Sequence, residues 1–239
     1  MTLREYLEVC YPKLQGGAKL YDYAFREVVI TQVAFEISDL PPEKKRGVNK
    51  AALQKKPFLQ QHGEGEARFS NPQQKEIYII DFEHYIDSFK GGSQASKGKK
   101  CDFILSDLET QSWIVLNELS MGQSEYLAKK EKDARLQFKS TIAKLSLDKT
   151  APKPFLSQFT YKVALLSYKF KSSKGESLVA KGISGFNKPT QIVGNVTSEE
   201  LFPEGFVWIQ CIYLTPFELS DTFLQEVCVS HSSEHYDLN

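Results

Sequence analysis

Two acidic residues on neighbouring apolar segments are the side chains of this sequence best suited to carry chemistry. Asp102 lies in the run Lys-Cys-Asp-Phe-Ile-Leu over 100–105, and Glu118 lies in Trp-Ile-Val-Leu-Asn-Glu-Leu-Ser over 113–120. Both runs are predicted β-strands, and the polar residues 106–111 between them are typical of a turn. Pairing of the two strands would bring two carboxylates to one edge of a sheet. Such a pair suits a hard divalent cation, Mg²⁺ or Mn²⁺, and ions of this kind catalyse phosphodiester hydrolysis.

A predicted helix over about 124–147 follows the second acid and carries further polar candidates. The face expected to pack on the core consists of Leu127, Ala134, Phe138, Thr141, Ile142 and Leu145. Gln137 flanks this face, and Lys130 lies seven residues earlier on the same edge of the helix. Gln137 and Lys130 therefore lie on one edge of the predicted helix.

The other apolar segments complete a succession of helices and strands. We predict, in chain order, a buried helix over 18–38, a strand over 76–87, strands over 159–170 and 205–214, and a short amphipathic segment over 217–227. The order across the centre of the chain is then helix, three strands, helix and strand. Residues 1–239 are expected to form a single domain, with a core over about 18–170 and an additional strand, short helix and polar tail over 171–239.

Two basic segments are candidates for contacts with phosphate groups. One spans residues 43–57, and the other is the Gly/Ser/Lys segment 91–100, which ends beside Asp102. Their candidate side chains are Lys44, Lys45 and Arg46 in the first segment and Lys97, Lys99 and Lys100 in the second. Lysines that meet a polyanion release its counterions, which favours binding. The alternative for the first segment is a solvated surface loop.

The composition limits what kind of protein this can be. The formal net charge is zero, so any contact with nucleic acid must depend on local basic patches rather than on a basic surface as a whole. The four cysteines are widely spaced and contain no CxxC pair, which favours buried thiols over a zinc site or disulfides. No apolar stretch approaches the roughly 20 residues that span a bilayer, so we expect a cytoplasmic protein with no membrane partner.

The element order and the two acids resemble the PD-(D/E)XK nuclease superfamily, a group of restriction-endonuclease-like proteins. Asp102 corresponds to the first acid of that pattern and Glu118 to the second. Ser120 stands where the family has its lysine, and Gln137 lies where the following helix often carries a polar residue. The resemblance covers roughly residues 20–170.

The resemblance implies an α/β (α+β) fold with an αβββαβ core, in which helices flank a central mixed sheet. It also implies a Mg²⁺-dependent endonuclease in which Asp102 and Glu118 hold the metal. The implied substrate is nucleic acid, DNA rather than RNA, and the implied setting is restriction or phage defence, with a homodimer or a partner protein of a defence complex.

Ser120 is the departure from the family pattern. A serine can form hydrogen bonds but supplies no positive charge. In some members of the superfamily the lysine moves to the neighbouring helix, and Lys130 is the candidate for that role here. The alternative is a catalytically inactive nuclease-fold protein that binds nucleic acid or a partner protein.

Other acids lie near the predicted strands. Glu27 and Glu36 fall in the predicted first helix, which in this family often adds an acid to the metal site. Asp107 and Glu109 lie in the predicted turn, where we expect them to face solvent.

Overall fold

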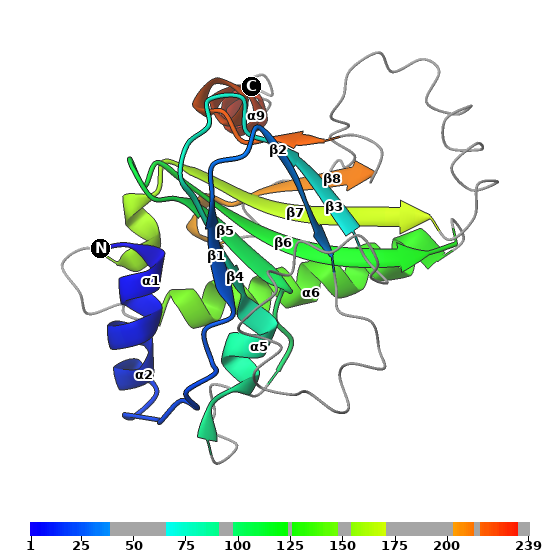
Figure 1. Ribbon diagram of the computed structural model, residues 1–239. Helices are drawn as coiled ribbons and strands as arrows, with labels where there is room; N and C mark the ends of the chain where they lie inside the picture. The colour runs from blue at the N-terminus through cyan, green and yellow to red at the C-terminus, as the bar shows by residue number, and fades with distance from the viewer. Residues whose placement is uncertain are drawn as a thin grey trace, which may run out of the picture.

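The computed structural model of the protein describes residues 1–38, 66–90, 98–123, 126–147, 154–170, 203–212 and 216–233. It has a mixed α/β architecture built on a six-stranded sheet (Figure 1). In spatial order the strands are β1 (Glu27–Ile30), β4 (Ile77–Asp81), β5 (Phe103–Asp107), β6 (Trp113–Gly122), β7 (Tyr161–Phe170) and β8 (Val207–Ile212). Neighbours from β1 to β6 pair antiparallel, whereas β6, β7 and β8 are parallel, so the sheet is mixed.

A second, three-stranded sheet packs over one face of the large sheet. It consists of β2 (Ala34–Ser38), β3 (Glu66–Ser70) and β9 (Phe217–Glu218). Phe35, Ile37 and Phe69 of this sheet share a buried cluster with Val115 and Leu165 of the large sheet. The C-terminal helix α9 (Asp221–Ser233) contributes Leu224 to the same cluster and lies on this side of the molecule (Figure 1).

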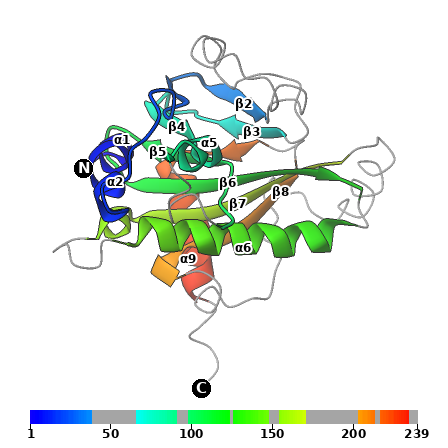
Figure 2. The ribbon, with the colours of Figure 1, turned by 90° about the horizontal axis from the view of Figure 1, so that it is seen from below.

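The long helix α6 (Leu127–Leu145) covers the opposite face (Figure 2). It connects β6 to the parallel strand β7, as a crossover between parallel strands requires. The buried residues of the helix are Ala134, Phe138, Thr141, Ile142 and Leu145. Its apolar side chains pack in one cluster with Ile104 of β5, Leu116 of β6 and Leu166 of β7. Successive residues of a strand point to opposite faces, so even-numbered residues of these strands face α6.

Short helices close one end of this cluster. They are α1 (Leu3–Glu5), the π-helical turn η1 (Tyr6–Cys10), α2 (Tyr11–Leu14), α5 (Phe82–Asp87) and the 3₁₀ turns η5 (Phe155–Gln158) and η6 (Pro203–Gly205). The Tyr6 ring stacks on Phe155 with centroids 4.0 Å apart, and its hydroxyl donates to the carbonyl of Leu145 at 3.1 Å. The N-terminal helices are thereby fixed to the end of α6.

Several sequence predictions are confirmed. The hairpin of β5 and β6, helix α6 and strands β7 and β8 lie where the sequence placed them. Five of the six residues assigned to the core face of α6 are buried, and Leu127 is half-buried. None of the helices within the described ranges is long and apolar enough to cross a membrane.

Two predictions about elements are wrong. The helix predicted over 18–38 is replaced by β1 and β2, because its β-branched residues pair as strands with β4 and β3. The segment 76–87 is not one strand but β4 followed by α5. Asp81 ends the strand by capping this helix, since its carboxylate accepts from the backbone N–H of His84 at 2.9 Å. The first helical segment lies instead at the N-terminus, in α1 to α2.

Candidate metal centre

The hairpin register brings Asp102 and Glu118 together. Phe103 of β5 lies opposite Asn117 of β6, and Asp102 directly precedes Phe103 while Glu118 directly follows Asn117. The paired residues end there, and each acid stands two residues from a strand residue on one face of the sheet. That face is the one covered by α6, since Ile104 and Leu116 lie two residues further along each strand and face the helix.

A backbone hydrogen bond fixes the first acid. The N–H of Leu119 donates to Oδ2 of Asp102 at 2.7 Å, which draws this carboxylate toward β6. Asp102 is half-buried, whereas Glu118 is only 8% exposed. Burying a carboxylate is costly unless it is hydrogen-bonded or paired with a cation, so this location demands compensating contacts.

Helix α6 provides one of those contacts. The Nε2 amide of Gln137 donates to Oε1 of Glu118 at 2.6 Å. Gln137 reaches the acid because its neighbours Ala134, Phe138 and Thr141 form the buried face that presses the helix onto the sheet. The predicted proximity of Gln137 to the acid pair is confirmed. The structure also ties the start of β5 to the helix, since the backbone N–H of Cys101 donates to Oγ1 of Thr141 at 2.9 Å.

The two acids place negative charge around a buried cysteine. Burial raises the pKa of the Cys101 thiol well above its ordinary value, and the negative charges of Glu118 and Asp102 raise it further. Both carboxylates therefore act on the same buried sulfur atom.

The donor set fits a hard divalent cation. Each carboxylate accepts at least one hydrogen bond from the protein, and ionised carboxylates are oxygen ligands of the kind that Mg²⁺ binds. Within the described ranges, no group of three or more His, Cys, Asp and Glu residues is placed to hold a metal. Mg²⁺ commonly binds to one or two carboxylates and completes its shell with water and substrate phosphates. The pair suits that mode rather than an all-protein cage.

Ser120 lies on the same face as Glu118, two residues further along β6. It is 7% exposed and lies opposite Tyr168 of β7 in the parallel register. The Tyr168 hydroxyl donates to the carbonyl of Gln123 at 2.9 Å. Ser120 itself brings no positive charge to the acids.

Lys130 occupies the expected edge of α6 but is exposed. Among the described residues it has no hydrogen bond or ion pair, and its charge acts on Asp133, one turn away. A hydrogen bond from Lys99 is the main cause that lowers the pKa of Asp133, with smaller contributions from Lys129 and Lys130. The predicted approach of Lys130 to the two carboxylates stays a prediction.

The basic candidates divide into two groups. Lys44, Lys45, Arg46 and Lys97 lie outside the described residues. Lys99 pairs with Asp133 at 2.8 Å, and Lys100 pairs with Asp87 of α5. These two ion pairs connect the residues before β5 to α6 and to α5. Their predicted contacts with nucleic acid stay predictions.

Three other acids have structural roles. Glu27 accepts hydrogen bonds from Arg4 and from the Tyr78 hydroxyl, and Glu36 pairs with Arg68 at 2.7 Å. Asp107, which we expected to face solvent, is buried and accepts from the backbone N–H of Glu109 at 2.8 Å. The side chain turns inward because it also accepts from Thr110 and lies 3.6 Å from Nζ of Lys75.

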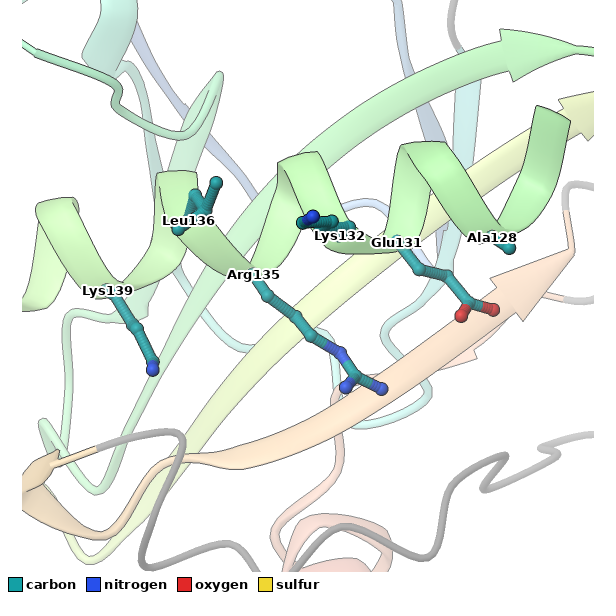
Figure 3. A pocket seen from close by; sticks show the side chains of 6 residues that line it. All are labelled: Ala128, Glu131, Lys132, Arg135, Leu136 and Lys139. Carbon is teal, nitrogen blue, oxygen red and sulfur yellow. The ribbon is translucent and has the colours of Figure 1, made fainter.

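A surface groove that the sequence did not reveal lies along α6, away from Gln137. Its lining residues are Ala128, Glu131, Lys132, Arg135, Leu136 and Lys139 (Figure 3). None of the acid-pair residues lines it. The signal available in the sequence was the spacing of Lys132, Arg135 and Lys139, which repeats at three and four residues.

Comparison of the chain with protein-family models, curated proteins and solved structures found no match.

Proposed function

We propose that this protein is a divalent-metal-dependent, endonuclease-like protein that hydrolyses phosphodiester bonds in nucleic acid, with DNA as the substrate and restriction or phage defence as the setting. The observation that supports this most strongly is the hydrogen bond from the N–H of Leu119 to Asp102, which ties Asp102 to the strand residue beside Glu118 at the end of the β5–β6 hairpin. The hydrogen bond from Gln137 to Glu118 adds the third member of the expected constellation.

The order of the elements also supports the proposal. Along the chain the N-terminal helices, β4, β5, β6, α6 and β7 occur in this order, as helix, three strands, helix and strand, with other elements between some of them. The three strands pair antiparallel, and β7 is parallel to β6. This is the order expected of an αβββαβ core, to which β1, β2, β3 and α5 are additions.

In the proposed reaction the chain positions the ion and the substrate. Asp102 and Glu118 would hold Mg²⁺ or Mn²⁺, which when bound lowers the pKa of a coordinated water and neutralises phosphate charge. Leu119 orients Asp102 through its N–H, and Gln137 orients Glu118. Lys130, on a long and flexible side chain, would supply the positive charge that Ser120 does not.

A second candidate function is a catalytically inactive nuclease-fold protein that binds nucleic acid or a partner protein. The specific observation in its favour is Ser120, which is buried in the position where the family has a lysine. The exposed position of Lys130 is compatible with either function.

Cleavage assays separate these functions. Plasmid DNA and structured RNA are incubated with the protein in Mg²⁺, in Mn²⁺ and in EDTA. The variant Asp102→Ala/Glu118→Ala removes the acid pair, and Asp22→Ala/Glu109→Ala removes two exposed acids as a matched control. We expect metal-dependent cleavage by the wild type and the control but not by the acid-pair variant. Binding without cleavage by the folded wild type would instead favour the inactive protein.

A further inference from the structure

The groove on α6 concentrates positive charge in a chain whose formal net charge is zero. Residues 127–145 contain six basic and two acidic side chains. Three of the basic ones, Lys132, Arg135 and Lys139, line the groove together with one acid, Glu131. Figure 3 shows Glu131, Arg135 and Lys139 pointing to the side of the helix on which β8 lies.

The three cations of the groove are not ion-paired within the described part of the fold. Neither Lys132, Arg135 nor Lys139 forms an ion pair or hydrogen bond with any described residue. Lys99 and Lys100, by contrast, are both ion-paired with side chains of the protein. The groove therefore presents charge that the described ranges leave uncompensated.

Arg135 is held in place for recognition by its packing. Its guanidinium carbon lies 5.0 Å from the ring centroid of Trp208 on β8. Its Nε atom is buried, and no hydrogen-bond acceptor among the described residues reaches it. A guanidinium stacked on an aromatic ring keeps its planar fork of donors oriented, and this fork matches the oxygens of a phosphate group.

The spacing of the three cations indicates a polymeric ligand. Lys132 and Lys139 are seven residues apart, which is roughly 10 Å along a helix axis. One phosphate cannot engage charges spread over that length, whereas successive phosphates of a nucleic-acid backbone can. Gln137 lies about halfway round the helix from Arg135, so groove and acid pair are separated by the width of α6.

We propose that this groove binds the phosphate backbone of nucleic acid, as a contact surface on α6 separate from the acid pair and from the basic segments before β5. This inference takes only the class of ligand, nucleic acid, from the proposed function. The positive groove would hold a strand whose continuation crosses α6 toward Asp102 and Glu118.

Binding in EDTA tests this surface without cleavage. Fluorescence anisotropy of labelled duplex and single-stranded DNA is measured over a range of salt concentrations. The variant Lys132→Gln/Arg135→Gln/Lys139→Gln is expected to bind at least tenfold more weakly. Its salt slope should fall by about 2–3, because each duplex phosphate contact contributes about 0.9. The charge-matched control Lys13→Gln/Lys19→Gln/Lys90→Gln, at three exposed positions, should bind within twofold of the wild type.

A second variant separates charge from packing. Lys132→Gln/Lys139→Gln leaves Arg135 on Trp208, and its melting temperature should match the wild type while its salt slope falls by about 2. Wild-type affinity in both groove variants, or equal losses in the Lys13, Lys19 and Lys90 control, would overturn the inference. So would displacement of DNA by inorganic phosphate at an equal concentration of phosphate groups. No step of these binding assays requires cleavage. If the protein binds DNA through the groove but does not cleave it, the proposed nuclease activity is refuted and the proposed binding surface is not.

Discussion

The amide of Gln137 on α6 donates a hydrogen bond of 2.6 Å to the carboxylate of Glu118 on β6. The helix that buries one face of the sheet therefore also orients the acid that the sheet presents. Asp102 is oriented differently, by a backbone N–H of the neighbouring strand. Two independent elements thus fix the two carboxylates, and loss of either contact should leave the other in place.

Replacing Gln137 should weaken the metal site without unfolding the protein. In Gln137→Leu the helix keeps its buried face, but Glu118 loses its orienting donor. Residues that orient metal ligands typically contribute 10–100-fold to metal affinity or activity. We expect the Mg²⁺ concentration for half-maximal cleavage to rise by about that factor. Gln225→Leu, an exposed position on α9, is the control and should show no change.

Binding of Mg²⁺ should stabilise the wild type through Glu118. At ten times its dissociation constant, an ion that binds only the folded state adds about 1.4 kcal/mol to the free energy of unfolding. Glu118→Gln should lose this gain, and in EDTA it should be at least as stable as the wild type because a buried charge is removed. Thermal unfolding in Mg²⁺ and in EDTA measures both effects. An equal Mg²⁺ shift in the variant would exclude Glu118 as a ligand.

A lysine at Ser120 should raise cleavage if the proposed function is correct. Ser120→Lys restores the (D/E)-x-K pattern on the face shared with Glu118. The longer side chain costs about 1–3 kcal/mol of stability at this buried position, and Ser120→Met should cost a similar amount. We expect the lysine variant to cleave at least tenfold faster than the wild type. The methionine variant should show no increase in rate. Equal rates for the two variants would show that charge at this position is irrelevant.

The sequence predicts the hairpin of β5 and β6, helix α6 and the acid pair because their signals are local. A polar turn between two apolar runs fixes the antiparallel pairing, and helical periodicity fixes which face of α6 is buried. Gln137 could be placed beside Glu118 for the same reason, since it flanks that face.

Two of the failures involve partners distant in the chain. β1 is a strand because it pairs with β4, with Glu27 opposite Ile80, and no local pattern shows that partner. Asp107 turns inward toward Thr110 and also toward Lys75, and Lys75 pairs with Asp221 of α9, 146 residues away. The groove cations were visible as charges, but the stacking of Arg135 on Trp208 depends on packing between α6 and β8.

Gly122 should tolerate no side chain while Tyr168 keeps its hydroxyl. A Cβ atom at Gly122 would lie 2.6 Å from the Tyr168 hydroxyl oxygen, which donates to Gln123. Gly122→Ala should lower the free energy of unfolding by about 1–3 kcal/mol, the usual range for overpacking. In the background Tyr168→Phe the same change should cost less, because the clashing atom is gone. Strict additivity of the two changes in chemical denaturation would contradict this contact.

Asp107 should make the stability of the protein depend on pH in the acid range. Burial alone would raise the pKa of Asp107, but hydrogen bonds from Thr110 and Glu109 and the charge of Lys75 lower it below its ordinary value. A lowered folded-state pKa stabilises the protein above the unfolded pKa of about 3.9, and this stabilisation is lost as the pH falls through the folded value.

Asp107→Asn should therefore lower the free energy of unfolding by about 1.5–3 kcal/mol at pH 7, the range for hydrogen bonds to charged groups. The difference from the wild type should shrink below about pH 4. Urea denaturation at pH 7 and pH 3 measures it, with the exposed Asp22→Asn as the control; a difference that is the same at both pH values would contradict the role of the charge.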